Sequence, residues 1–139
     1  MEAPGGYFGS ATARAEGVEG RFAPIDGQPT LTPSPGVHIQ PVPGERVLLC
    51  RVTIDPDSEA PVHTHDEEQM GIVLSGSGDF HLDGVIRRVG PGDTYHAPPG
   101  VAHGLLAGAE GWSREQSGRG LTTSELANVV ERFPRGRDD

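Results

Sequence analysis

The stretch PVHTHDEEQMGIVLSG, residues 61–76, decides how this chain of 139 residues folds. Its first half gathers two histidines, three acidic residues and a glutamine, and its second half is apolar. Residues two apart on a β-strand point to the same face, so a strand through His63 and His65 presents two imidazoles side by side. Gln69 follows four positions later, where an adjoining strand can return to the same volume. We therefore expect ligand-type side chains at the end of a buried strand.

Short strands separated by turns surround this stretch. From Arg46 to Ile54 apolar residues alternate with others, which predicts a strand with one buried face. Further strands are expected at residues 63–65, 69–74, 80–82, 85–89 and 94–97. The dipeptide Asp83-Gly84 is a strong hairpin signal between two of them, whereas the prolines between residues 27 and 44 leave room for only one short edge strand, at 37–40. With 21 glycines and 13 prolines, this spacing indicates an all-β sandwich or barrel.

Length and composition restrict the classes of function. A chain of 139 residues fits one domain, and we expect a flexible tail over residues 1–20 followed by that domain over residues 21–139. The formal net charge of −9 argues against nucleic acid and against an anionic membrane surface as partners, because both attract clustered basic residues. Cys50 is the single cysteine and the first residues lack the layout of a secretory signal, so we expect a cytoplasmic protein without disulfides.

The segment at residues 122–133 fits two structures. Thr122 to Glu125 reads as a helix-capping box, and the apolar residues that follow have helical spacing. The same sequence fits a strand over residues 128–133 that ends at Pro134. Propensity favours the helix, and the topology of the fold has to decide.

The histidines predict a metal site. His103 follows a tight Pro-Pro-Gly loop and is placed to add a third imidazole to His63 and His65. Three neutral imidazoles and the amide oxygen of Gln69 suit a divalent metal of borderline softness. A His-x-His pair alone is weak evidence, since six histidines in 139 residues produce such a pair by chance fairly often.

Two motifs with fixed spacing resemble those of the cupin family. The first family motif contains Gly, His-x-His, Glu and Gly, and the residues that match it are His63, His65 and Gly76. Gln69 stands where the family usually has Glu, and Asp57 stands where it has the first Gly. The second motif is matched by Gly92, Pro98, Gly100 and His103, with Ala107 in place of its final Asn. The resemblance covers roughly residues 35–110, and the motifs themselves lie within 57–107.

This resemblance implies a single-domain cupin β-barrel or jelly roll, a homodimer as in many relatives, and one divalent metal ion held by His63, His65, Gln69 and His103. Because the last cupin strand commonly ends in a Phe-Pro turn, it also favours the strand at residues 128–133. With Gln in place of Glu, three neutral imidazoles leave the ion its full charge of +2. We expect this to strengthen Lewis-acid chemistry and weaken redox chemistry, with zinc as the favoured metal and nickel, iron or manganese as alternatives.

The expected activity is that of a metal-dependent enzyme acting on a small enolisable carbonyl compound. All eleven basic residues are arginine, which indicates a GC-rich genome, and small cupins of such origin resemble polyketide cyclases of secondary metabolism. A non-haem dioxygenase and a sugar or uronate isomerase are the alternative enzymes. A non-catalytic ligand-binding cupin is the third class, although the chain has no basic patch that suits DNA.

Several other residues are candidates for proton transfer or metal binding. One of the neighbours Tyr95 and His96 must point inward on its strand; an inward Tyr95 would protonate an enolate, and an inward His96 would act as acid–base group or extra ligand. Glu68, like Glu67 before it, is a candidate general base, with a solvated loop charge as the alternative. His38 is a candidate further ligand, with surface packing as the alternative.

Overall fold

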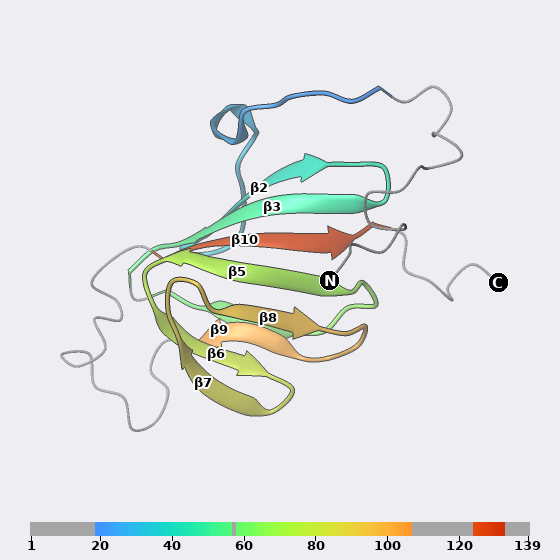
Figure 1. Cartoon of the computed structure of the whole chain (residues 1–139). Coiled ribbons are helices and arrows are strands. Elements are labelled where there is room, and N and C mark those ends of the chain that lie inside the picture. Colours follow the sequence, from blue (N-terminus) through green and yellow to red (C-terminus); the bar gives the residue numbers. More distant parts are fainter. Residues whose placement is uncertain (1–18, 57, 107–123, 133–139) are drawn as a thin grey trace, which may run out of the picture.

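Figure 1 shows the computed structural model, in which the described residues form two antiparallel β-sheets and almost no helix. The structure describes residues 19–56, 58–106 and 124–132. A short 3-10 helix, η1 (Ile25–Gly27), precedes the strands. The strands are β1 (Leu31–Ser34), β2 (Val37–Pro43), β3 (Val47–Ile54), β4 (Ala60–His63), β5 (Gln69–Ser75), β6 (Gly78–Leu82), β7 (Val85–Val89), β8 (Thr94–Ala97), β9 (His103–Leu106) and β10 (Ser124–Glu131).

The larger sheet has six strands in the order β1-β2-β3-β10-β5-β8, and the smaller has four in the order β4-β9-β6-β7. Neighbours in both sheets that are distant in sequence, such as β10 between β3 and β5, give the crossed connectivity of a jelly roll. The expected all-β cupin-type barrel is confirmed. No helix in the described ranges is long and apolar enough to cross a membrane.

The core lies between the two sheets and draws on both inner faces. In β3, Cys50, Val52 and Ile54 are buried, as the alternating pattern predicts. The other buried apolar residues are Val37, Val73, Phe80, Tyr95, Ala97, Leu105 and Leu126. A strand buried on one face places every second residue in the core, and this periodicity decides which polar residues of the same strands face inward.

The segment with two candidate structures is a strand, β10. It pairs with β3 from Ser124 to Glu131 and with β5 on its other side. Two neighbouring strands satisfy its backbone groups on both edges, which outweighs the helical propensity of its residues. The strand starts four residues before the predicted Asn128, and its predicted end at Phe133 lies outside the described residues.

The predicted hairpin between β6 and β7 is confirmed. Leu82 pairs with Val85, and the two turn residues Asp83 and Gly84 have φ of 53° and 82°. Both positive values are required by a two-residue turn that matches the twist of its strands, and Asp followed by Gly adopts them readily.

The prediction of a single short edge strand before residue 44 is wrong. The edge strand is β1, while β2 runs from Val37 to Pro43 between β1 and β3. β1 pairs only with the first part of β2, at Val37 and Ile39. Pro41 and Pro43, which pair with β3, lie beyond β1, so the missing N–H groups fall on the side of β2 where none of the described strands pairs with it.

The outer face of the larger sheet carries exposed apolar side chains, including Leu49, Val129 and Met70, which lie in register on three adjacent strands. The expected homodimer stays a prediction. Most of the expected flexible tail at residues 1–20 lies outside the described residues.

Candidate metal centre

Three histidines meet between the sheets. His63 ends β4, His103 begins β9, and the two residues are direct partners across these antiparallel strands. His65 lies in the bend after β4, so the strand predicted at residues 63–65 ends at His63. The ring centroid of His63 lies 5.3 Å from that of His65 and 4.5 Å from that of His103. One ring nitrogen from each histidine lies within 4.8 Å of the others.

The hydrogen bonds of the three rings determine which nitrogen faces the cluster. The Nδ1 atoms of His63, His65 and His103 each lie 2.9 Å from a backbone carbonyl, of Pro61, Glu67 and Val101 respectively. A carbonyl only accepts, so each Nδ1–H donates. In the neutral ring the other nitrogen, Nε2, then carries a lone pair, which is the arrangement that prepares histidine as a metal ligand.

His103 is the most deeply placed member of the cluster. Its side chain is only 3% exposed, and its buried Nε2 has no hydrogen-bond partner among the described residues. Burial lowers the pKa of His103, and the neighbouring imidazoles of His63 and His65 lower it further against the opposing effect of the Val101 carbonyl. The ring is therefore neutral at neutral pH, and its lone pair is available to a cation.

Gln69 faces this cluster from the other sheet. Its side chain is buried, and its Oε1 lies 3.1 Å from Nε2 of His65. Because Nδ1 of His65 holds the proton, two acceptor atoms of the neutral ring and the amide oppose each other. Such a pair is unfavourable alone and favourable around a cation, so the approach of Gln69 supports its place in the ligand set.

The residues present fit a divalent ion. Two nitrogen ligands at about 2.1 Å from one ion are at most about 4.2 Å apart, so the cluster needs only a small inward movement to close on it. The unpartnered Nε2 of buried His103 is the observation that favours an ion most, because such an atom otherwise costs free energy.

Tyr95 supports Gln69 from β8. Its side chain points inward, and its hydroxyl accepts a short hydrogen bond from Nε2 of Gln69. Burial raises the pKa of Tyr95 to about 12, so the phenol keeps its proton at neutral pH. Its ring packs on Phe80 with centroids 4.4 Å apart. Of the neighbours Tyr95 and His96, one of which was predicted to point inward, it is Tyr95 that does so.

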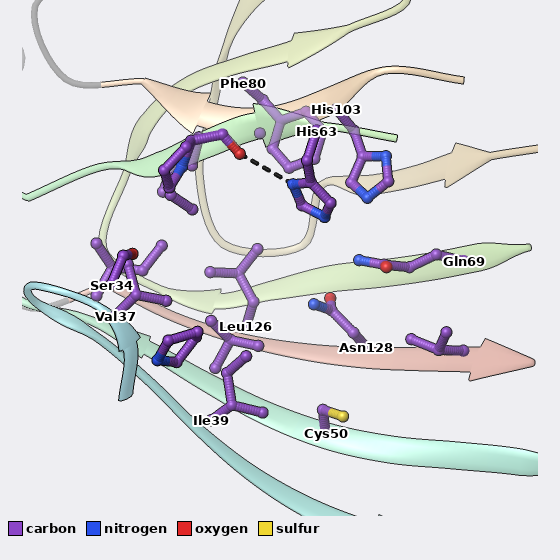
Figure 2. Close-up of a pocket in the computed structure, with 18 of the residues that line it drawn as sticks. Ser34, Val37, Ile39, Cys50, His63, Gln69, Phe80, His103, Leu126 and Asn128 are labelled. Carbon is purple, nitrogen blue, oxygen red and sulfur yellow. Dashed lines mark hydrogen bonds between the residues drawn. The ribbon is translucent and has the colours of Figure 1, made fainter. Parts of the chain in front are cut away.

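A cavity of about 420 Å³ opens beside the cluster. Figure 2 shows His63 and His103 on one side of it, with Gln69 and Asn128 facing them from the strands opposite. We call His63, His65 and His103 the histidine wall, and Gln69, Tyr95 and Asn128 the amide wall. The rest of the lining is mainly apolar, with Phe80 and Leu126 among its residues.

His96 and Glu68 do not reach this cavity. His96 is exposed on the outer face of β8, since Tyr95 and Ala97 take the inward positions, and its Nε2 lies 2.6 Å from Oε2 of Glu68. Neither residue lines the cavity. The roles of His96 and Glu68 in proton transfer stay predictions, since in this structure the two side chains are hydrogen-bonded to each other outside the cavity.

His38 is also remote from the cluster. It alternates with the inward residues Val37 and Ile39 of β2, and its two ring nitrogens lie 3.2 Å from Oγ1 of Thr32 and 3.0 Å from Oδ2 of Asp55. Both ring nitrogens have partners there, and the role of His38 as a further ligand stays a prediction. Glu67 stays near the cluster, with Oε1 3.5 Å from Nδ1 of His65, where it supports the ring rather than binding an ion.

One residue of the amide wall, Asn128, was not identified from the sequence. Asn128 lies on β10 and Tyr95 on β8, and both pair with Gly71 of β5 between them. A Cβ atom on Gly71 would lie 2.2 Å from Oδ1 of Asn128 and 2.4 Å from Cε1 of Tyr95. Glycine at this position therefore makes the space in which the two side chains meet. Asn128 could have been found by treating residues 124–131 as a strand, because every second residue then faces inward: Leu126, Asn128 and Val130.

The fold agrees with comparisons to known proteins. A family model described as a cupin domain matches residues 50–110, which include all three histidines and Gln69. This segment of the chain is a cupin domain. No curated protein matches the sequence significantly.

Solved structures of cupins superpose on most of the chain. An RmlC-like cupin from Shewanella frigidimarina has a TM-score of 0.66 at 21% identity and covers 86% of this chain and 96% of its own. KdgF from a Halomonas species has a TM-score of 0.66 at 24% identity, covering 86% and 98%. The polyketide cyclase RemF from Streptomyces resistomycificus has a TM-score of 0.64 at 20% identity, covering 84% and 82%. At these identities the likeness concerns the cupin fold.

Proposed function

We propose that this cupin is a metal-dependent enzyme that acts on a small enolisable carbonyl compound, with polyketide cyclisation as the reaction class it fits best. The observation that carries the proposal is the convergence of three imidazoles whose Nδ1 atoms all donate to backbone carbonyls, beside an apolar cavity. The similarity to a polyketide cyclase is consistent with it.

The ligand set would be His63, His65, His103 and Gln69, and zinc is the favoured ion. All four ligands are uncharged, so the ion keeps its full positive charge. A divalent ion in such a site polarises a carbonyl oxygen and makes the neighbouring C–H group more acidic.

The chain's own residues supply position and a proton. Gln69 is held by its bond to Tyr95, which keeps the amide oxygen directed at His65. Tyr95 holds a proton on its phenol oxygen, and no described residue accepts it, so Tyr95 would donate it to an enolate in the cavity. The apolar lining excludes water from the reacting atoms and thereby strengthens each of these interactions.

The test is elemental analysis of protein purified without chelator or added metal, combined with a proton-exchange assay. We expect about one zinc ion per chain, and faster exchange of the methyl protons of acetophenone in D2O, followed by NMR, with the metal-loaded protein than with buffer and zinc alone. Iron or copper at that ratio, with oxygen uptake, would favour the dioxygenase instead. A protein without any bound metal would contradict both enzymes.

A further inference from the structure

Asn128 is a buried amide that is not part of the proposed ligand set. It is 8% exposed, lines the cavity, and its Oδ1 has no hydrogen-bond partner among the described residues. An unpartnered buried polar group costs free energy, so a native protein that keeps one needs a compensating gain. A leucine of nearly the same shape would fill the position without that cost.

The surroundings of Asn128 are arranged around it. Gly71 leaves the space that its Oδ1 occupies, and Tyr95 lies on the far side of the same glycine. Asn128 and Tyr95 both pair with Gly71, which is the next inward residue of β5 after Gln69. Gln69 itself pairs with Val130 and Ala97. Figure 2 shows the side chains of Asn128 and Gln69 on the strands opposite His63 and His103. A molecule bound at the histidine wall would therefore have Asn128 beside it.

The remaining lining limits what this molecule can be. Among the described residues, those that line the cavity include no Asp, Glu or Arg, and most are apolar. With the ion occupied by the carbonyl group of the substrate, a carboxylate elsewhere in the cavity would lack a cationic partner. Each hydroxyl of a sugar beyond the few polar groups would be buried without a hydrogen bond. The volume of about 420 Å³ equals the share of about 14 water molecules, which suits a compound of one or two rings.

We propose that Asn128 is a specificity-determining residue that holds a hydroxyl group of an otherwise apolar, uncharged carbonyl substrate. A hydroxyl both donates and accepts, so it matches an amide, which offers a carbonyl oxygen and an NH2 group. The inference rests on the proposed function for the position of the carbonyl group at the histidine wall. It adds the substrate class, hydroxylated ring ketones, and it disfavours sugars and uronates.

The test uses acetophenone, its three ring-hydroxylated isomers and glucuronate as probes, with calorimetric titration of the full-length, metal-loaded protein. We expect at least one hydroxyacetophenone to bind about tenfold more tightly than acetophenone, the gain typical of one buried hydrogen bond. In Asn128→Leu the ratio should fall to about one, with the metal content unchanged. Val129→Leu, a conservative change at the neighbouring outward position of β10 that does not line the cavity, should keep the ratio.

A second measurement separates recognition from a structural role. If Asn128 supported the fold, Asn128→Leu would lower the midpoint of thermal unfolding without ligand; we expect an equal or higher midpoint, because an unpartnered polar group is removed. A lower midpoint, a hydroxyl preference that survives in Asn128→Leu, tight binding of glucuronate, or binding of no ketone would each overturn the inference. A wild type that prefers the hydroxyl but contains no metal would reject the proposed function and leave the role of Asn128 standing.

Discussion

The histidine wall and the amide wall differ in how far along the chain their supporting contacts reach. Each imidazole is held by a carbonyl only two residues away: Pro61 for His63, Glu67 for His65 and Val101 for His103. The amide wall is held by long-range contacts, namely the bond from Gln69 to Tyr95 and the register of β10 with β5.

This difference separates two tasks within one site. Local backbone contacts fix the ring tautomers wherever the surrounding sheet is formed, so ion binding depends on a few short segments. The amide wall depends on the alignment of three strands, which makes it suited to shaping the cavity around a particular molecule. Changes in one wall should therefore leave the property of the other largely intact, and five substitutions test this separation.

The largest effect, a loss of metal affinity, is expected when a residue of the histidine wall is substituted. His65→Ala and His103→Ala each remove a ligand, and because loss of a supporting residue alone typically costs 10–100-fold in metal affinity, we expect more than about a 100-fold loss. The measurement is metal content after dialysis against a weak chelator. His96→Ala, which removes an exposed histidine outside the cavity, is the control and should keep the ion. Full metal content in both cluster variants would refute the site.

The next effect is expected in the amide wall, from Tyr95→Phe. This change removes the hydroxyl that holds Gln69 and carries the proton, while the ring can still pack on Phe80. We expect proton exchange of acetophenone to slow about 100-fold, the lower end of the range for general acid–base groups, while the metal content stays near that of the wild type. An unchanged exchange rate would remove Tyr95 from the mechanism.

A smaller effect is expected from Gly71→Ala. The new methyl group would overlap both Asn128 and Tyr95, and forcing extra volume into a packed interior costs about 1–3 kcal/mol. Urea unfolding should report this loss in the free energy of unfolding. Gly90→Ala is a matched control, because a Cβ at Gly90 meets no atom within 4 Å. Equal stability of the two variants would mean that the walls are less tightly fitted than the structure shows.

The smallest change in metal content is expected for Gln69→Glu. A carboxylate is still an oxygen ligand, so the ion should be retained and bound somewhat more tightly, as competition with a coloured chelator would measure. The carboxylate cannot donate to Tyr95, so the phenol would donate to it instead, and its proton would no longer be available. Exchange of acetophenone protons should therefore slow. A faster reaction would contradict the inference that the neutral Gln69 favours Lewis-acid chemistry by leaving the ion its full charge.

The same contrast explains what the sequence allowed us to predict. The histidine wall was predicted because its members lie in short motifs with readable spacing, and the hairpin at Asp83-Gly84 was predicted from two residues. His65 was placed on a strand that in fact ends at His63, yet the bend brings its ring to the same cluster. Local rules were sufficient because the supporting contacts are local.

The amide wall was only partly predictable. Gln69 followed from the motif, and the neighbours Tyr95 and His96 were narrowed to one inward residue without a choice between them. Asn128 was missed because its inward position depends on the register of β10 against β5, a contact between residues far apart in the chain. β1 was missed because its proline and those of β2 suppress the usual strand signal.

The prolines of β2 also affect how this molecule can meet others. Residues two apart on a strand direct their N–H positions to the same side, so Pro41 and Pro43 together remove two donors from the open edge beyond β1. A foreign strand arriving there would find no donor at either proline, and the carbonyl of Pro43 already accepts a hydrogen bond from the Arg21 guanidinium, so the strand would gain little by pairing. The sequence thus protects the end of its larger sheet against the edge-to-edge growth that leads to aggregation. A dimer of this protein would have to be built from a face or another edge.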